Sequence, residues 1–313
     1  MNVIKSAVLR TISSGWGGRR LSFLGQFLRA KPTVLGFTNP FHMSHVATAQ
    51  AGNIYLSHVN NYIALQSGRR KMIKFDPALY EPEVTFLMQS LISKNDNILD
   101  VGANIGFHTI TMAKAAYPGH LYAFEPVSEM ANQNSLNCAL NRLDNVSIIE
   151  CALGDKSSEM EMQININGIG MEGTSTLLQE NVHVSQHPEN YSSRKVKIHR
   201  LDDIIENLDI SGRIGFIKID TEGFDALVLD GAMKTIKKHK PIMIVEAHSK
   251  RLEQTGKSWK WYLDSFPAYH VCIISPLTEA KPYLHLEPLT PDQPEISVNL
   301  LLLPRTHTVT PKL

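Results

Sequence analysis

Small and acidic residues follow the apolar runs of this sequence, at points where a strand would end and a helix would begin. The first such segment is Asp100-Val101-Gly102-Ala103-Asn104-Ile105-Gly106. Glycines there let a ligand approach the backbone, and open N–H groups at the start of a helix favour a carboxylate or phosphate. The spacing is G-x-N-x-G, however, and not the G-x-G-x-x-G of dinucleotide-binding proteins. Asp100 precedes the glycines and is placed to meet a cationic amine.

A second acid, Glu125, ends the next apolar run, and Ala152 and Leu153 follow the third run. A carboxylate placed like Glu125 accepts hydrogen bonds from both hydroxyls of a ribose. A backbone amide and an apolar side chain at 152–153 would hold an adenine ring, although a plain strand-end turn explains them equally well. Together the three segments predict a nucleoside cofactor.

The elements that must position these residues alternate regularly. Strands are expected at 98–101, 121–124, 146–149, 196–198, 214–219, 242–245, 271–274 and 298–302, with helices at 105–116, 129–143, 201–208, 225–238 and 259–263. Such alternation predicts βαβ units and a parallel sheet. Residues 160–169 have the pattern of an added strand pair. The polar stretch 170–195 is longer than most loops without a function, so we expect it to cover the substrate.

Composition places the chain among ordinary globular proteins. It has 313 residues, 43% of them hydrophobic, which suits one large α/β domain with an extension. Cys138, Cys151 and Cys272 lack metal-ligand spacing and favour a reducing compartment, so we expect a cytoplasmic protein. No apolar run approaches the roughly 18 residues of a membrane-spanning helix.

Residues 1–75 differ in charge from the rest of the chain. They carry ten Lys and Arg and no acid, whereas the remainder has 21 basic and 30 acidic residues. We expect 1–75 to be a basic extension with a small β-like region, and 76–313 to be the main domain. Residues 1–31 suit a helical extension, an amphipathic segment in peripheral contact with a membrane, or an organellar transit peptide. The acidic body argues against nucleic-acid binding.

The chain resembles the FkbM-type S-adenosylmethionine-dependent methyltransferases over about residues 76 to 250. The similarity rests on an ordered set of segments: Leu79-Tyr80-Glu81-Pro82-Glu83, Asp100 to Gly106, Ala123-Phe124-Glu125-Pro126, Ala152-Leu153-Gly154-Asp155, Arg200-Leu201-Asp202-Asp203, Lys218-Ile219-Asp220-Thr221-Glu222-Gly223 and Pro241-Ile242-Met243-Ile244-Val245-Glu246. The resemblance implies a Rossmann-like class I methyltransferase fold, with a mostly parallel seven-stranded sheet and helices on both faces. It also implies O-methylation by S-adenosylmethionine of a saccharide, glycolipid or other small-metabolite hydroxyl.

The resemblance also assigns cofactor-binding residues. Asp100, Gly102, Asn104 and Gly106 would hold the amino acid part of the cofactor, Glu125 its ribose, and Ala152 with Leu153 its adenine; Tyr80 joins this predicted set. An alcohol needs a base to become a good nucleophile. The candidates follow the later strands, where ligands of open α/β sheets bind. Asp220 is our first choice, followed by His248 and Glu222; the alternatives are a helix cap, a structural histidine and a solvated acid.

Other functions remain open at this point. His183 and His187 are four residues apart, but no H-E-x-x-H motif is present, and we predict no metal site. A non-catalytic methyltransferase-like scaffold that binds a membrane or a partner is one alternative. A nicotinamide-dependent oxidoreductase is another, and the G-x-N-x-G spacing disfavours it.

Overall fold

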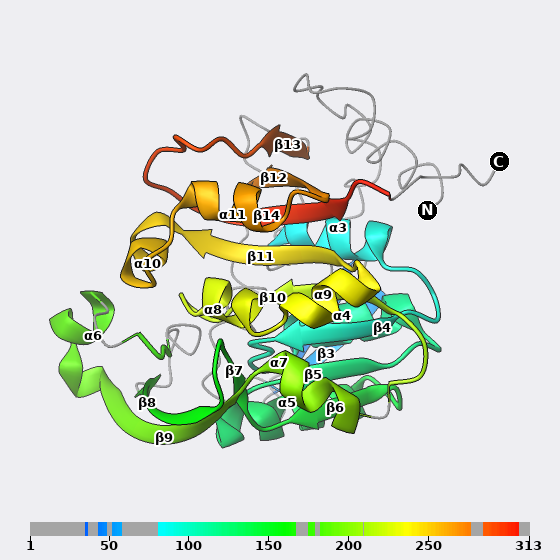
Figure 1. The fold of residues 1–313 in the computed structure, drawn as a ribbon. Coiled ribbons are helices and arrows are strands. Elements are labelled where there is room, and N and C mark those ends of the chain that lie inside the picture. Colours follow the sequence, from blue (N-terminus) through cyan, green and yellow to red (C-terminus); the bar gives the residue numbers. More distant parts are fainter. Residues whose placement is uncertain are drawn as a thin grey trace.

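The computed structural model describes residues 35–36, 43–48, 52–57, 81–166, 175–178, 182–208, 210–276 and 284–306. Its centre is an eight-stranded sheet in the order β13-β12-β14-β11-β10-β4-β5-β6, with helices on both faces (Figure 1). The strands are β4 (Asn97–Val101), β5 (Leu121–Phe124), β6 (Val146–Ile149), β10 (Ile214–Ile219), β11 (Ile242–His248), β12 (Tyr269–Ser275), β13 (His285–Pro288) and β14 (Ser297–Pro304).

Five neighbouring strands, from β6 to β11, run parallel, and β14 lies antiparallel between β11 and β12. The expected strand count of seven was wrong, because β13 adds an eighth strand beside β12. This edge strand has only four residues, none of them fully buried. Its sequence therefore contains no apolar run that periodicity would detect.

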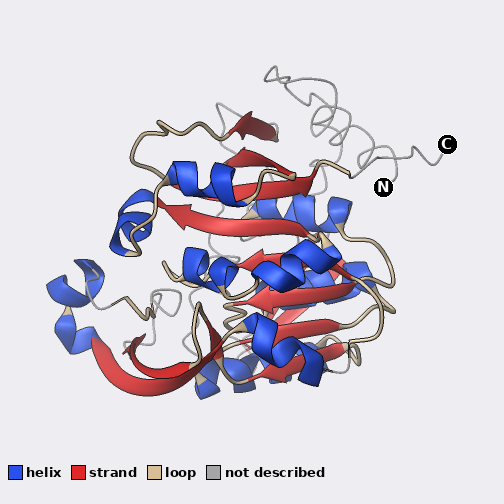
Figure 2. Cartoon of the chain, viewed as in Figure 1, coloured by secondary structure: helices blue, strands red, loops and turns tan. Residues whose placement is uncertain are grey.

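Helices cover the two faces of the sheet (Figure 2). One layer contains α3 (Pro82–Leu91), α4 (Phe107–Ala116) and α5 (Ser128–Leu140), and the other contains α7 (Leu201–Ile204), the 3-10 helix η4 (Ile205–Asn207), α8 (Asp225–Asp230), α9 (Met233–His239), α10 (Ser249–Gln254) and α11 (Trp259–Ser265). All of β4 is buried, and its side chains alternate between the layers: Ile98 packs in the core beside α3 and α4, and Leu99 packs in the core on the other face. Burial on both faces explains the continuous apolar runs of the central strands.

The single helix expected over 225–238 is divided into α8 and α9. Gly231 lies at the division, and a Cβ atom there would be 1.9 Å from the carbonyl oxygen of Gly154. The Asp202 carboxylate starts α9 by accepting the N–H groups of Lys234 (2.9 Å) and Thr235 (2.8 Å). The helix is therefore interrupted by contacts with distant residues, namely the Gly154 carbonyl and the Asp202 carboxylate, although the apolar pattern of the sequence continues across the break.

A second sheet in the order β7-β9-β8 forms an arm beside the main sheet. Its strands are β7 (Ala152–Leu153), β8 (Ser158–Asn165) and β9 (Tyr191–His199), and α6 (Val182–Gln186) and the 3-10 helix η3 (Pro188–Asn190) precede β9. The expected strand at 196–198 therefore belongs to β9 and not to the main sheet. Of the strand pair expected at 160–169, residues 160–165 lie in β8 and 167–169 fall outside the described residues. Arg194 of β9 ties the arm to α5 through two hydrogen bonds to Glu129 (2.6 and 2.8 Å).

The N-terminal region contributes a separate three-stranded antiparallel sheet of β1 (Leu35–Gly36), β2 (Met43–Thr48) and β3 (Gly52–Ser57). This sheet lies in the small β-like region expected within residues 1–75. Residues 1–31 and Tyr80 fall outside the described residues. No helix within the described ranges combines the length and apolar character that crossing a membrane requires.

Candidate active site

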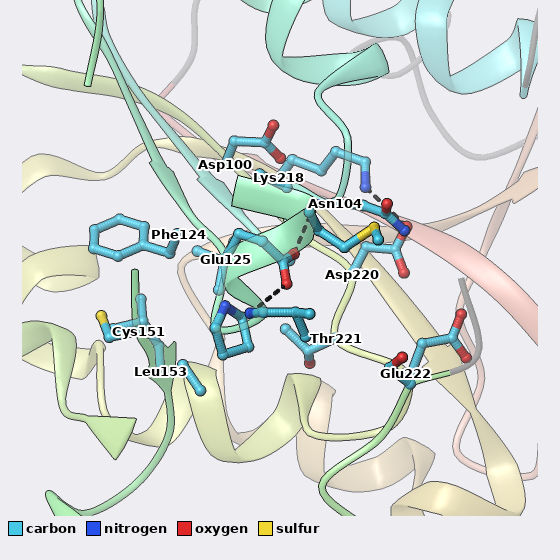
Figure 3. A pocket seen from close by; sticks show the side chains of 18 of the residues that line it. Asp100, Asn104, Phe124, Glu125, Cys151, Leu153, Lys218, Asp220, Thr221 and Glu222 are labelled. Carbon is cyan, nitrogen blue, oxygen red and sulfur yellow. Dashed lines mark hydrogen bonds and ion pairs between the residues drawn. The ribbon is translucent and has the colours of Figure 1, made fainter. Parts of the chain in front are cut away.

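A cavity opens at the carboxyl ends of β4, β5 and β10 (Figure 3). Strand β4 pairs with β5 on one side and with β10 on the other, so the strand order reverses at β4. Ligands of open α/β sheets bind at such a switch point. The predicted site residues that line the cavity are Asp100, Gly102, Asn104, Glu125, Ala152, Leu153, Asp220 and Glu222.

The backbone between β4 and α4 turns sharply, with φ angles of 80° at Gly102, 49° at Asn104 and 90° at Gly106. A Cβ atom at Gly102 would lie 1.8 Å from the carbonyl oxygen of Asp220. Gly102 therefore allows the ends of β4 and β10 to meet. Gly106 is absent from the cavity lining, and a Cβ atom there would lie 2.1 Å from Oδ1 of Asn134 on α5. Helix packing accounts for this second glycine.

The N–H groups of residues 102 to 106 all have acceptors within the protein. The first two donate to the carbonyl of Phe124 (3.0 and 3.1 Å) and the fifth to that of Ala103 (3.0 Å). The third donates to Glu125 Oε2 (2.8 Å) and the fourth to Asn104 Oδ1 (2.7 Å). No N–H group of residues 102–106 is therefore open to an anion; the helix start to which the expectation refers lies further on, because α4 begins at Phe107. The acidic side chains around the loop are the groups that a ligand would contact there.

Glu125 is held at the end of β5 with its carboxylate in the cavity. Its two oxygens accept the N–H groups of Asn104 (2.8 Å) and Val127 (2.9 Å). The side chain is buried, and burial raises the pKa of Glu125 to about 7, although both N–H groups oppose the change. Figure 3 shows Glu125 projecting between Asn104 and Thr221. This fixed carboxylate suits a pair of ligand hydroxyls.

Asp100 is fully buried at the end of β4. Its Oδ2 accepts the hydroxyl of Thr109 (2.6 Å), whereas Oδ1 has no hydrogen-bond partner among the described residues. Burial raises the pKa of Asp100, and the positive charge of Lys218 opposes that change. A buried carboxylate oxygen without a partner is costly. A ligand ammonium group would supply the missing donor.

The opposite wall of the cavity is apolar. Ala152 and Leu153 of β7 are buried there, and Met162 of β8 and Leu177 of the 170–195 stretch lie on the same cavity. An apolar wall beside the Glu125 carboxylate suits a flat aromatic ring. Met162 was not among the residues predicted for the site, although its alternation with Met160 along β8 is the pattern of a half-buried strand.

Lys218 is a cavity residue that the sequence analysis did not single out. It is 2% exposed, and its Nζ donates to Asp220 Oδ2 (2.8 Å). Burial alone would lower the pKa of Lys218, but the charges of Asp220, Asp100 and Glu81 raise it above its ordinary value. A lysine near the end of an otherwise apolar, buried strand was the available signal, because a buried lysine must be paired.

Glu81 and His108 form a hydrogen-bonded pair at the edge of the cavity, in which His108 is buried and Glu81 is half-buried. Glu81 Oε2 lies 2.9 Å from His108 Nε2, and Asn299 of β14 donates to the other oxygen (3.1 Å). Burial opposes ionisation of Glu81, but the hydrogen bond and charge of His108 and the charge of Lys218 outweigh it and lower its pKa to about 2. The contacts join α3, α4 and β14, so no local pattern indicates them.

His248 is placed apart from the other catalytic candidates. It does not line the cavity, and its Nδ1 accepts the N–H of Lys250 (3.2 Å) at the start of α10. The structure thus brings together Asp220 and Glu222 but not His248. Within the described residues no group of three or more His, Cys, Asp or Glu is arranged for a metal ion. The His187 ring lies 3.6 Å from Glu189 instead.

The strand order, with β14 antiparallel between β11 and β12, and the cavity at the switch point define a class I methyltransferase fold. A model of the methyltransferase FkbM domain matches residues 100–271, more than half of the chain. The chain belongs to the FkbM methyltransferase family.

Two fungal proteins are similar to this chain. Methyltransferase 1 of Beauveria bassiana (strain ARSEF 2860) is 26% identical over 145 residues, which cover 43% of this chain and 57% of that protein. Methyltransferase sdnD of Sordaria araneosa is 26% identical over 162 residues, covering 45% and 61% respectively. The chain thus spans less than two thirds of either relative. The crystal structure of methyltransferase FkbM from Methylobacillus flagellatus KT is 17% identical, with a TM-score of 0.40, and covers 67% of this chain and 44% of that one.

Proposed function

We propose that the chain is an S-adenosylmethionine-dependent O-methyltransferase that acts on a hydroxyl of a saccharide, glycolipid or other small metabolite. One observation carries the proposal: two buried carboxylates, Asp100 and Glu125, lie at the ends of adjacent strands and line the same cavity. Asp100 has an oxygen without a hydrogen-bond partner among the described residues, and the Glu125 carboxylate is aligned by two backbone N–H groups. The ammonium group of S-adenosylmethionine would donate to the first carboxylate, and its two ribose hydroxyls would donate to the second.

The cofactor would be held by groups of this chain with distinct roles. Asp100 would accept its ammonium group and Glu125 its ribose hydroxyls, while Ala152 and Leu153 would pack against adenine. Gly102 and Asn104 shape the loop between the two carboxylates. When bound, the cofactor supplies an electrophilic methyl group.

The acceptor would bind beyond Asp220, on the far side of Thr221 from Glu125 (Figure 3). Asp220 is hydrogen-bonded to Lys218, so its carboxylate is fixed in orientation. In this position Asp220 would orient the acceptor hydroxyl. Most of the acceleration of an in-line displacement comes from such positioning and from exclusion of water.

Titration calorimetry of the full chain with S-adenosylmethionine tests the proposal. We expect micromolar affinity in the wild type and its loss in Glu125→Ala, with no binding of a nicotinamide dinucleotide. A folded wild-type chain that binds no S-adenosylmethionine contradicts the proposal. Transfer of a labelled methyl group to a panel of methyl glycosides then tests the acceptor class. Cofactor binding without transfer to any acceptor would favour the non-catalytic scaffold.

The oxidoreductase alternative is disfavoured by the same loop. Its spacing is G-x-N-x-G and not the G-x-G-x-x-G of dinucleotide-binding proteins, and the N–H groups of residues 102–106 already have acceptors within the protein. We also propose a cytoplasmic location, supported by three cysteines that are all buried thiols.

A further inference from the structure

The turn after β10 holds Glu222 in an unfavourable backbone conformation. Its φ is 55°, a value that non-glycine residues rarely adopt. Asp225 braces the turn by accepting the N–H groups of Thr221 (2.7 Å) and Gly223 (3.1 Å). Thr176, from the 170–195 stretch, donates its hydroxyl to the Glu222 carbonyl (3.0 Å). Conformations of this kind persist where surrounding contacts hold them, and they cluster at functional sites.

Arg251 of α10 bridges Glu222 to a second carboxylate. Its Nη2 donates to Glu222 Oε2 (2.8 Å), and its Nη1 donates to Glu246 Oε2 (3.2 Å). The three side chains are largely buried, with exposed fractions of 19% for the arginine and 26% and 21% for the two acids. A Cβ atom at Gly223 would lie 2.8 Å from Cδ of the arginine, so the glycine makes room for its stem.

This bridge has one positive charge for two carboxylates, and its surroundings add further negative charge. The negative charges of Asp220 and Asp225 raise the pKa of both acids. The buried hydroxyl of Tyr262, on α11, has no hydrogen-bond partner among the described residues. Burial raises the pKa of Glu222 to about 8; Asp220 and Asp225 add to the rise, and Arg251 opposes it. Burial and the neighbouring acids raise the pKa of Glu246 well above its ordinary value. The neighbouring negative charges favour the protonated form of each acid, so an ionised Glu222 is a stronger base than an ordinary glutamate.

We propose that Glu222 accepts the proton of the acceptor hydroxyl, and that Arg251 is a positioning residue that holds Glu222 beside Glu246 at the acceptor end of the cavity. The assignment rests on the proposed methyltransferase function. The O–H bond of the acceptor breaks and its proton passes to a Glu222 carboxylate oxygen. The acceptor oxygen forms a bond to the methyl carbon, and the electron pair of the broken C–S bond stays on sulfur. Asp220 keeps its orienting role.

The first test measures the titration of Glu222 in the full chain without any ligand. Protein labelled with ¹³C at the glutamate carboxyl carbon is followed by NMR from pH 5 to 10, and Glu222→Gln identifies the signal. We expect a midpoint of about 8 in the wild type. In Arg251→Gln it rises by about one pH unit or more, because an opposite charge is lost. Arg251→Lys keeps the charge and stays closer to the wild type.

Lys257→Gln is the matched control, because it removes another ion pair of the same face, Lys257 Nζ to Asp230 (2.6 Å), whose members do not line the cavity. Its Glu222 midpoint should equal that of the wild type. A wild-type midpoint near the ordinary glutamate value of about 4.3, or one that Arg251→Gln leaves unchanged, overturns the proposal.

The second test separates this proposal from the methyltransferase function itself. S-adenosylmethionine affinity is measured on the same samples, and its absence from the wild type would contradict the function while the NMR titration still tests the bridge. With any methyl glycoside that is methylated, kcat should fall about 100-fold or more in Glu222→Gln, with the KM for S-adenosylmethionine unchanged. The rising limb of the pH profile should shift in Arg251→Gln together with the NMR midpoint. An unchanged kcat in Glu222→Gln refutes the role of Glu222.

Discussion

Lowering the pH should weaken S-adenosylmethionine binding through Glu125. This carboxyl group has a pKa raised to about 7 by burial, and ribose hydroxyls donate to its ionised form. At pH 8 roughly nine tenths of the groups are ionised, and at pH 6 roughly one tenth. The affinity should therefore fall about tenfold from pH 8 to pH 6, which is about 1.4 kcal/mol.

Calorimetry in two buffers of different ionisation enthalpy measures both the affinity and the protons exchanged. Because binding favours the ionised form, we expect proton release of about half a proton per site at pH 7. Glu125→Gln should bind weakly with a flat pH dependence. Glu150→Gln is the control, since Glu150 ends the next strand as an exposed acid bonded to Ser128 outside the cavity. An affinity that stays constant between pH 6 and 8 in the wild type refutes this reasoning.

Two stability predictions concern residues that connect distant parts of the chain. Gly102→Ala should lower the free energy of unfolding by about 2 kcal/mol or more. Alanine is strained at φ 80°, and its Cβ would lie 1.8 Å from the Asp220 carbonyl oxygen. A variant that unfolds in urea at the same midpoint as the wild type would contradict this prediction. Asp202→Ala should cost about 2 kcal/mol by removing the cap of α9, while S-adenosylmethionine affinity stays within about twofold. A large loss of affinity in a folded Asp202→Ala protein would show that the cap also shapes the cavity.

The alternation of apolar runs and helical patterns was sufficient to predict the parallel sheet and the residues at its strand ends. Asp100 and Glu125 were found because the first lies at the end of a buried strand and the second directly follows one, and parallel strands place their carboxyl ends at one edge. Local order along the chain therefore carries this part of the site. The β9 strand was misassigned because its apolar pattern shows that it is half-buried but not which sheet it joins.

Contacts between distant segments formed the rest of the site. Lys218 is placed among three carboxylates that lie on other elements or beyond the end of its strand. Arg251 bridges an acid that follows β10 and an acid within β11. Gly106 was expected at the cofactor, but its surroundings show a packing role against α5. Charge, burial and close approach depend on which elements pack together in three dimensions. Residue order specifies the elements and the edge of the sheet where chemistry can occur, whereas packing determines which side chains meet there and with what charge.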